Sequence, residues 1–320
     1  MNGTLVNHKT IIVTGGTGTI GAEIVRHLLG THASQIRIYS RDEHKQLELQ
    51  QELPKDGRLR FLLGDIRDKE RMDFAFHGVD ICFHAAALKH VPFCEYNPFE
   101  AIKTNIVGTQ NVIDLALKHN IEKVIAISTD KAVNPTSVLG TSKLMMEKLI
   151  TAANQLIGDK RTKFATVRFG NVLSSRGSVM PIWINQIEKG GPLTITDKRA
   201  TRFFMEVPEA VDLVFKAAEI MRGGEIFVLK MRRKFKIVDF ANDVLERHAA
   251  GKKIAVKFIG LRPGEKLHEE LVTEDEASHA IETKDMLIIL PQHYAEGEEP
   301  HLRNYRGAKR MKAKAYSSDQ

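Results

Sequence analysis

The stretch 128–143, "STDKAVNPTSVLGTSK", brings hydroxyls, a carboxylate and two ammonium groups together just after an apolar segment. Side chains of these types accept, donate and relay protons when they are held close to one another. Thr129, Asp130 and Lys131 are consecutive, so a single backbone turn would place all three beside one ligand. The stretch is therefore a candidate centre for proton transfer.

Two observations limit that interpretation. Leu139 precedes Lys143 by four residues and carries no group that can move a proton. A Ser-Thr-Asp sequence after a strand is also an ordinary signature of a helix start, and Lys131 taken alone has a surface position as its alternative. The chemistry of this stretch thus depends on what else the chain contains.

A glycine-rich loop, "TGGTGTIG", lies between an apolar run and an amphipathic segment. Gly15 permits a tight turn, Gly18 lets backbone amides approach a pyrophosphate, and Gly21 lets the following helix pack close to the strand. The helix N-terminus then faces the anion. In this strand–loop–helix context the loop predicts a dinucleotide site, the alternative being a purely structural glycine turn.

The end of the second strand-like segment carries the residues that choose the dinucleotide. In "IYSRDEHK", Ser40 and Arg41 stand at the deciding position, with Lys45 nearby. An arginine there accommodates a 2′-phosphate, which favours NADP, whereas Asp42 and Glu43 keep NAD as the alternative. A loop arginine exposed to solvent is the structural reading of Arg41.

The third strand-like segment ends in "GDIRD". Asp65 in this motif has two readings, as an acceptor for the adenine amino group or as the cap of the next helix. The other residues expected to line the cofactor are Thr17, Thr19, Ile20, Ile66, Ala85, Ala86, Lys89, Asn105, Ser128 and Lys143.

Strand-like and helix-like segments alternate through the first half of the chain and would position these residues. The apolar runs 10–15, 35–40, 58–65, 79–86, 123–128 and 163–170 read as buried strands, and 19–30, 98–119 and 140–156 have helical periodicity. Such alternation predicts an α/β fold with a doubly wound, parallel Rossmann-type sheet. Ligands then bind at the carboxyl ends of its strands.

The second half is less regular and predicts a smaller C-terminal substrate-binding lobe. We assign residues 1–170 to the dinucleotide-binding domain, with its sheet completed by parts of 203–230. Residues 171–292 are mainly the substrate lobe, and 293–320 read as a basic surface tail.

The composition is that of a globular protein with a formal charge of +7. The basic excess is concentrated in 230–236 and 303–316, and neither segment is interleaved with several aromatic residues as in single-strand binders. A solvated basic surface is the expectation, with a polyanion contact as the alternative. Nucleic acid is not expected as a partner.

Membrane and metal functions are not indicated. No apolar run approaches the ~20 residues that span a bilayer, and the N-terminal residues contain no signal-peptide core. A cytoplasmic location follows as an expectation. Cys82 and Cys94 match no metal-ligand spacing, so reduced thiols and no metal site are expected.

Several blocks together resemble a known family. They are "TGGTGTIG", "YSRDE", "GDIRD", "HAAALKHVPFCEYNP", "KTNIVGTQNV", "STDKAVNP", "RFGNVLSSRGSV", "TRFFM" and "RPGEKLHEEL". Over roughly residues 10–290 the chain is similar to the extended short-chain dehydrogenases of polysaccharide biosynthesis. Within these it resembles the branch of soluble UDP-N-acetylglucosamine 4,6-dehydratases.

The resemblance implies a reaction and its cofactor. NADP takes a hydride from C4 of the hexose, the 4-keto group acidifies C5, the 6-hydroxyl leaves as water, and the hydride returns to C6. Protons must leave the 4-hydroxyl and C5 and reach the departing hydroxyl. The family commonly uses a tyrosine for the first of these movements, but some branches carry methionine there, and Leu139 resembles that second group.

The resemblance also implies roles for the residues of the first motif. Asp130 would be the acid for the 6-hydroxyl and Lys131 the base at C5, each with a pKa drawn toward neutrality. Thr129 would hold the 4-hydroxyl, whose proton would pass to Lys131, or to Asp130 through Thr129. Lys143 would bind the nicotinamide ribose.

Substrate contacts are expected from loops that follow later strands. By resemblance Lys89 contacts the sugar, with His90 beside it, while Asn105 bonds backbone near the active strand or lies on a helix surface. Forked donors of arginine suit a diphosphate, although salt-bridge roles are the alternative. The expected substrate-binding residues are Lys89, His90, Thr129, Asn171, Ser174, Arg176, Arg202, Arg262 and Glu265.

Other functions remain open at this stage. A UDP-hexose 4-epimerase, or a dehydratase that also epimerises C5 or C3, would use the same scaffold. A catalytically silent nucleotide-binding or RNA-binding regulator is a hypothesis of another class. The resemblance further implies a homo-oligomer that packs through the helices 98–119 and 140–156, with the methionines at 145–146 as either an apolar contact or core.

Overall fold

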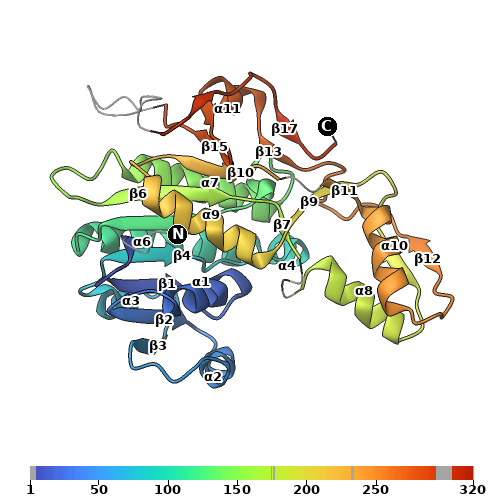
Figure 1. Ribbon diagram of the computed structural model, residues 1–320, viewed down its shortest axis with the longest axis horizontal. Coiled ribbons are helices and arrows are strands. Elements are labelled where there is room, and N and C mark those ends of the chain that lie inside the picture. Colours follow the sequence, from blue (N-terminus) through green and yellow to red (C-terminus); the bar gives the residue numbers. More distant parts are fainter. Residues whose placement is uncertain (1–4, 174, 176, 232–233, 293–304, 320) are drawn as a thin grey trace.

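The computed structural model of the chain describes residues 5–173, 175, 177–231, 234–292 and 305–319. Ser174 and Arg176, both expected at the substrate, lie outside the described residues. Within the described residues, ten strands form the main sheet and the remaining strands form three small sheets. The main sheet and its helices make up the larger body of the molecule (Figure 1).

Seven neighbouring strands of the main sheet, counted over the described residues, run parallel. In sheet order they are β3 (Leu59–Leu63), β2 (Gln35–Ser40), β1 (Thr10–Thr14), β4 (Ile81–His84), β5 (Lys123–Ile127), β6 (Lys163–Arg168) and β10 (Ile226–Leu229). The chain runs outward from β1 to β3 and then resumes on the other side of β1. This reversal confirms the predicted doubly wound sheet and creates a switch point, where ligands of such folds bind.

Helices cover both faces of the parallel sheet. They are α1 (Thr19–Leu29), α2 (Glu43–Glu52), α3 (Lys69–Phe76), α6 (Gly108–Lys118), α7 (Val138–Ala153) and α9 (Val207–Ile220). Side chains alternate along β1, so that Ile11 and Val13 join the core under α1 and α9, whereas Ile12 joins the core under α3, α6 and α7. Burial on both faces explains why the strands read as continuous apolar runs.

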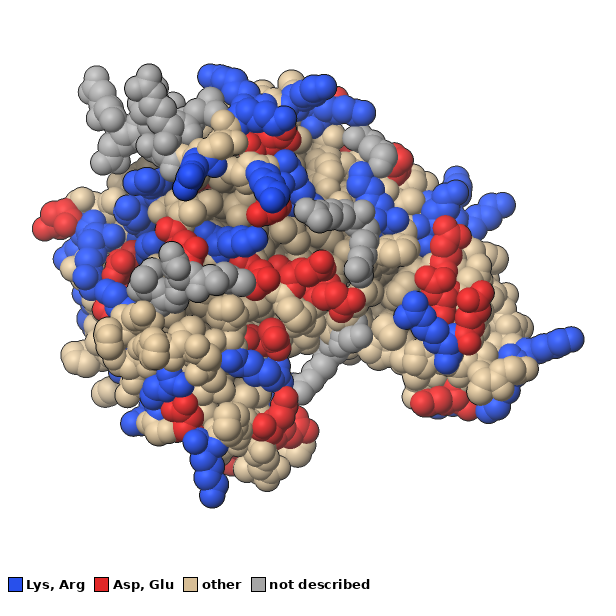
Figure 2. Space-filling view, viewed as in Figure 1, with Lys and Arg blue, Asp and Glu red and all other residues tan. Residues whose placement is uncertain are grey.

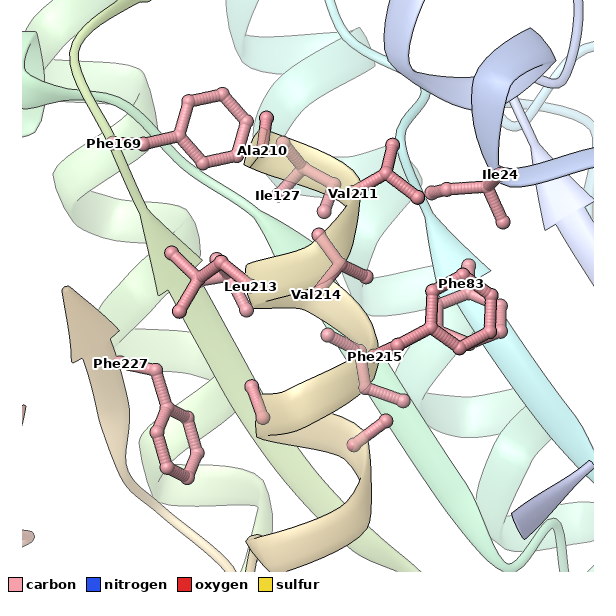
Figure 3. Close-up of a cluster of buried hydrophobic side chains, with 14 of the residues drawn as sticks. Ile24, Phe83, Ile127, Phe169, Ala210, Val211, Leu213, Val214, Phe215 and Phe227 are labelled. Carbon is pink, nitrogen blue, oxygen red and sulfur yellow. The ribbon is translucent and has the colours of Figure 1, made fainter. Parts of the chain in front are cut away.

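The core under α9 shows how the late part of the chain closes this sheet. Val211, Val214 and Phe215 of α9 point toward Phe83 of β4 and Ile24 of α1 (Figure 3). The rings of Phe83 and Phe215 lie 5.1 Å apart, which is a favourable aromatic contact. Since α9 leads into β10, the segment 203–230 supplies both a covering helix and a strand to the main sheet.

The expected helix 98–119 is interrupted. α4 (Val91–Tyr96) and α5 (Pro98–Ala101) are followed by the π-helix η2 (Ile102–Val107), which continues into α6. Segments with π-helical bonding are frequent at functional sites. The four large apolar side chains most exposed on α4, α5 and α7 are Phe93, Tyr96, Phe99 and Met145, whereas Met146 is in the core. We retain the expected homo-oligomer as a proposal on this surface.

A smaller lobe stands apart from the main sheet, with α8, α10 and β12 side by side (Figure 1). It consists of α8 (Val179–Glu188), β8 (Leu193–Ile195), α10 (Ile237–His248) and β12 (Val256–Phe258). Trp183 of α8 is the largest side chain of its core, and the indole nitrogen donates to the carbonyl of Thr194 at 2.8 Å. A three-stranded sheet of β7 (Asn171–Val172), β9 (Thr201–Met205) and β11 (Lys234–Lys236) links the lobe to the larger body.

The prediction of a basic surface tail over 293–320 is wrong for the described residues 305–319. β15 (Met286–Ile289), β14 (Ala280–Glu282) and β16 (Lys309–Arg310) extend the main sheet, and β17 (Tyr316–Ser317) pairs with β13 (Glu270–Val272) near α11 (Glu274–Ser278). Tyr305 is buried and its hydroxyl donates to Glu225 at 2.6 Å. Buried anchors between the basic residues were not recognised in the sequence.

Charge is mixed on the face shown in Figure 2, where acidic and basic side chains are interspersed. Lys309, in the expected basic tail, pairs with Glu282 at 2.7 Å. Cys82 and Cys94 are buried free thiols. Among the helices of the described residues, none has both the length and the apolar character needed to traverse a bilayer.

Candidate active site

A cleft of about 830 Å³ runs along the carboxyl ends of the parallel strands and continues to the smaller lobe. The loops after six parallel strands, β1 to β6, form one wall, and α8, β8, β9 and the segment 259–269 form the other. The cleft thus lies at the switch point that the topology creates.

Most of the residues predicted to act on ligands line this one cleft. They are Gly15, Thr17, Gly18, Thr19, Ile20, Gly21, Ser40, Arg41, Asp65, Ile66, Ala85, Ala86, Lys89, His90, Ser128, Thr129, Lys131, Lys143, Asn171, Arg202, Arg262 and Glu265. Asp130 and Asn105 lie behind the wall, both fully or almost fully buried. The sequence motifs, although far apart along the chain, therefore converge on one site.

The glycine loop has the close packing that a pyrophosphate cradle requires. Gly15 has a φ of +67°, and a Cβ there would come within 2.6 Å of the Ala86 amide nitrogen. The Gly18 amide donates to the Gly15 carbonyl at 2.9 Å, and no side chain caps the N-terminus of α1. The first amides of α1 thus face the cleft with a partial positive charge, so the residues present fit a dinucleotide pyrophosphate.

Replacing Gly21 with alanine is expected to weaken dinucleotide binding about tenfold or more, a loss of about 1.4 kcal/mol. A Cβ at Gly21 would lie 2.3 Å from the Gly15 carbonyl oxygen, so α1 must move away from the loop. Gly57→Ala is the matched control because nothing lies within 4 Å of a Cβ there. Titration of each variant with NADP by calorimetry measures the effect, and equal affinities would contradict the expectation.

The two readings of Asp65 are resolved against helix capping. Asp68 caps α3, accepting from the Arg71 amide at 2.9 Å. Asp65 instead accepts from Arg67 at 2.7 Å and lies 3.4 Å from Arg41. Burial raises the pKa of Asp65, but hydrogen bonds from Arg67 outweigh it and hold the pKa below its ordinary value.

The loop after β2 forms the end of the cleft where the sequence predicts that adenosine binds. Thr17 and Ser40 share a hydrogen bond of 2.8 Å between their hydroxyl oxygens, which ties the glycine loop to the end of β2. Arg41 is half exposed at the cleft rim, where its side chain can reach a ligand. Asp42 caps α2 and forms an ion pair with Lys45 at 2.5 Å, so the charges of these two side chains neutralise each other.

Asn105 organises the loop after β4. Its side-chain oxygen accepts from the Leu88 amide at 2.8 Å, and its nitrogen donates to the Leu88 carbonyl and to Ser142. The helix-surface alternative is therefore wrong, because Asn105 is buried within η2. The bond to Leu88 fixes the backbone next to Lys89, which lines the cleft together with Ala85.

His90 lies between the loop after β4 and the loop that opens α8. A Cβ at Gly177 would lie 2.3 Å from His90 Cε1, so the ring packs directly on that glycine. Burial, together with the charge of Lys89, lowers the pKa of His90. His90 is consequently neutral at pH 7 and suits packing or hydrogen bonding rather than anion binding.

Thr129, Asp130 and Lys131 form a compact hydrogen-bonded group at the end of β5. A short 3₁₀ turn, η3 (Asp130–Ala132), directs them, and the Thr129 hydroxyl donates to Asp130 Oδ1 at 2.8 Å. Lys131 Nζ donates to the same oxygen at 2.9 Å and to Asn171 Oδ1 at 3.1 Å. Asp130 is 0% exposed, whereas the Lys131 side chain is 25% exposed toward the cleft.

The pKa of Lys131 differs from the expectation. Burial lowers it, but the carboxylates of Asp130 and Glu269 outweigh burial and raise the pKa above its ordinary value. The expected displacement toward neutrality is therefore wrong for this state of the site. Lys131 is an ammonium here, and it becomes a base only after losing a proton.

Lys143 and Leu139 project from α7 beside this group. Lys143 Nζ donates to the Ile127 carbonyl at 2.6 Å, and burial lowers its pKa to about 8, so it remains mainly protonated at pH 7. Leu139 is buried against Cys94 and Ala101 and lines the cleft. The position thus supplies an apolar wall and no proton.

The two arginines of the substrate side are both engaged by Glu265. Arg202 Nη2 donates to Glu265 Oε1 at 2.9 Å, and Arg262 Nε donates to Oε2 at 3.2 Å. Arg202 is buried and also donates to the carbonyls of Thr201 and Leu267. Protein partners therefore engage its hydrogen-bond donors, as the alternative of a salt-bridge role for Arg202 predicted. Arg262 is 57% exposed at the cleft and remains the better-placed contact for a phosphate.

Sequence reasoning missed Glu269. This carboxylate lines the cleft, is 3% exposed, and places Oε1 3.6 Å from Lys131 Nζ. Burial raises the pKa of Glu269, and this effect exceeds the lowering of the pKa by Lys131 and the other nearby cations. The signal was present in the block "RPGEKLHEEL", but nothing in the spacing shows which of its acidic residues turns inward.

Comparisons with known proteins identify relatives of the chain. The family model described as "Polysaccharide biosynthesis protein" matches residues 11–291. The chain is 43% identical, over 98% of its length and 94% of the relative's, to a UDP-N-acetylglucosamine 4,6-dehydratase (inverting) of Campylobacter jejuni. It is 43% identical to a UDP-glucose 4-epimerase of Rickettsia prowazekii, covering 85% of this chain and 80% of that one.

A solved structure is similar over nearly the whole chain. The X-ray structure of Pen from Bacillus thuringiensis superposes with a TM-score of 0.91 at 42% identity, covering 98% of this chain and 94% of Pen. The arrangement of sheet and smaller lobe described above is thus that of a known structure.

Proposed function

The chain belongs to the polysaccharide biosynthesis protein family, and on that basis we propose that it is a nicotinamide-dependent UDP-N-acetylglucosamine 4,6-dehydratase. The observation that carries the proposal is the hydrogen-bonded group of Thr129, Asp130 and Lys131, in which Thr129 and Lys131 line the same cleft as the glycine loop and Asp130 is buried behind them. A relative with this activity at 43% identity over 98% of the chain supports it.

The chain's own residues would handle the protons of this reaction. The nicotinamide cofactor, when bound, supplies a hydride acceptor that later returns the hydride. Thr129 holds the 4-hydroxyl, and the proton of that hydroxyl passes to Asp130 through the existing 2.8 Å hydrogen bond. Asp130, now a carboxylic acid behind the cleft wall, returns that proton through the Thr129 hydroxyl to the departing 6-hydroxyl, and Lys131 removes the C5 proton.

The surroundings of this group suit substrate and cofactor positioning. Lys143, mainly protonated at pH 7, binds the nicotinamide ribose and places positive charge near the ring. Lys89 contacts the sugar from the loop that Asn105 fixes. Arg262 contacts the diphosphate, and Glu265 holds the arginine in place from Oε2.

NADP is the cofactor that we propose, on the strength of Arg41 at the cleft rim. Replacing Arg41 with alanine is expected to weaken NADP binding by about tenfold and to leave NAD binding nearly unchanged, because a hydrogen bond to a charged group contributes about 1.5–3 kcal/mol. Arg60→Ala, an exposed arginine of β3, is the control. Equal losses for both dinucleotides, measured by calorimetry, would argue against a 2′-phosphate contact.

The second candidate is a UDP-hexose 4-epimerase, which the relative in Rickettsia prowazekii favours. Incubation with UDP-N-acetylglucosamine and NADP, followed by mass spectrometry of the sugar nucleotide, separates the two. Loss of one water supports the dehydratase, whereas an unchanged mass with an altered C4 configuration supports the epimerase. A proton spectrum of the product formed in deuterated water then gives the configuration at C5.

A further inference from the structure

Glu269 occupies an unusual position beside Lys131. It precedes β13 and is held by backbone bonds in both directions, since its amide donates to Ser318 Oγ at 2.9 Å and its carbonyl accepts from the Ser318 amide at 2.8 Å. Within the described residues, its Oε2 is buried without a hydrogen-bond partner. A buried carboxylate left incompletely paired at a cleft wall requires an explanation.

The number of protons that must move in the proposed reaction provides an explanation for this buried carboxylate. The Lys131 ammonium and Asp130 form an ion pair of 2.9 Å, so this pair can take up only one further proton. The 4-hydroxyl delivers that proton, and the proton on C5 must then leave before the 6-hydroxyl has taken one from Asp130. Leu139 cannot accept a proton, so a third acceptor has to be connected to Lys131.

We propose that Glu269 is this third acceptor and that it takes a proton from Lys131 so that the lysine can act as the base. The inference rests on the function proposed above. The Nζ–H bond of Lys131 breaks with its electron pair staying on nitrogen, and an O–H bond forms on Glu269 Oε1. The separation of 3.6 Å is an ion-pair distance, which the flexible lysine side chain can shorten.

The remaining steps balance. The free amine forms an N–H bond with the C5 hydrogen, the C5–H electron pair becomes the C5–C6 double bond, and the C6–O pair leaves with oxygen. That oxygen takes the proton of Asp130 and departs as water. When the hydride returns to C6, Lys131 returns its proton to C5 and recovers the one held by Glu269.

The charges around Glu269 suit a temporary acceptor. Lys131 and Asp130 face it from η3, Arg202 approaches its Oε1 to 3.9 Å from β9, and Lys266 approaches Oε2 to 3.9 Å. Burial dominates these contacts and raises the pKa of Glu269, as does Asp130, so it accepts a proton more readily than an exposed carboxylate.

Glu265 does not serve equally well. Burial raises its pKa too, but Arg262 and Arg202 outweigh burial and lower the pKa below its ordinary value. Its two oxygens also bond both arginines. The carboxylates of Asp42 and Asp65 lie at the adenosine end of the cleft, paired with Lys45 and Arg67.

Glu269→Gln tests the proposal because it keeps the size of the side chain but cannot take up the proton. We expect kcat for water loss to fall on the order of 100-fold. In a single turnover with UDP-N-acetylglucosamine, reduced nicotinamide should still form, because the Asp130–Lys131 pair can accept the first proton. Glu269→Asp keeps an acid and should recover part of the activity.

The control is Glu270→Gln, which removes the same charge at the next residue, where the side chain bonds Asn134 at 2.6 Å outside the cleft. Unchanged water loss in Glu269→Gln would overturn the proposal, as would an equal fall in nicotinamide reduction and water loss, because that result indicates a structural role. If the unmodified chain itself releases no water, the proposed function fails, and the third-acceptor role fails with it.

The pH profile gives a second readout. Glu269 accepts a proton only while it is a carboxylate, so kcat of the unmodified chain should fall as pH decreases through the raised pKa of Glu269. Glu269→Gln should lack this acidic decline. An identical acidic decline in both proteins would contradict the assignment.

Discussion

Replacing Lys131 with alanine is expected to lower kcat for water loss by about 10²–10⁴-fold, the contribution typical of a positioned general base. The structure places this lysine at the cleft wall with its Nζ 2.9 Å from Asp130 and 3.6 Å from Glu269. In the proposed dehydration, Lys131 is the residue that connects either carboxylate to C5 of the sugar. Measurement of kcat and of dinucleotide affinity should show a loss in the first alone.

Two further variants distinguish the role of Lys131 as a base from the role of its positive charge. Lys131→Arg keeps the positive charge, but a guanidinium does not deprotonate in proteins, so activity should stay low. Lys55→Ala removes an exposed lysine from the loop between α2 and β3 and should leave activity unchanged. Full turnover in Lys131→Ala, or recovery in Lys131→Arg, would assign the chemistry to another residue.

The sequence predicted the local geometry of the glycine loop well, for a physical reason. Gly15, Gly18 and Gly21 act within one strand–loop–helix unit, so their spacing along the chain fixes their spacing in the molecule. The same holds for Thr129, Asp130 and Lys131, which occupy one short turn after β5. Local geometry of this kind can be predicted from the sequence without knowledge of the rest of the fold.

Contacts between residues that are far apart in the sequence could not be predicted in the same way. Glu269 meets Lys131 from a loop more than a hundred residues later, and its backbone is fixed by Ser318 from the segment expected to be a tail. Its neighbour Glu270 has the same residue type but bonds Asn134 instead. Which of two adjacent carboxylates enters the cleft depends on the pairing of β13 with β17, which no local pattern encodes.

The charges of the site follow from the same long-range contacts. The expectation of a near-neutral pKa for Lys131 relied on its closeness to Asp130 and to the cofactor, whereas in the structure Asp130 and Glu269 together raise that pKa. Arg202 was expected to bind a diphosphate, but Glu265 and three main-chain carbonyls occupy its donors. A residue type predicts what a group can do, and its partners decide what it does.

A fully buried arginine of the parallel sheet carries the largest expected effect on stability. Arg168 of β6 is 0% exposed, and its guanidinium donates to Glu147 of α7 and Glu276 of α11. Burial opposes its charged form, but the two carboxylates outweigh burial and raise its pKa. The group therefore connects the parallel sheet, a covering helix and the C-terminal segment.

Arg168→Met is expected to lower the free energy of unfolding by about 3–5 kcal/mol, because it leaves the buried carboxylate of Glu147 without its partner. Arg199→Met is the matched control, since Arg199 makes a similar ion pair with Asp197 at 2.8 Å on an exposed surface. Because solvent screens exposed pairs, Arg199→Met should change the stability little. Urea denaturation of the three proteins measures both differences.

The double variant Arg168→Met, Glu147→Leu identifies the cause of the loss. If the cost arises from an unpaired buried charge, removing Glu147 as well should recover much of the stability, because apolar replacements of buried ion pairs are often neutral or stabilising. If the cost arises from losing the link to Glu276 and the Leu271 carbonyl, the double variant should be no more stable than Arg168→Met. Equal stability of Arg168→Met and Arg199→Met would mean that neither effect operates, and that the covering helix and the C-terminal segment are held to β6 by apolar packing alone.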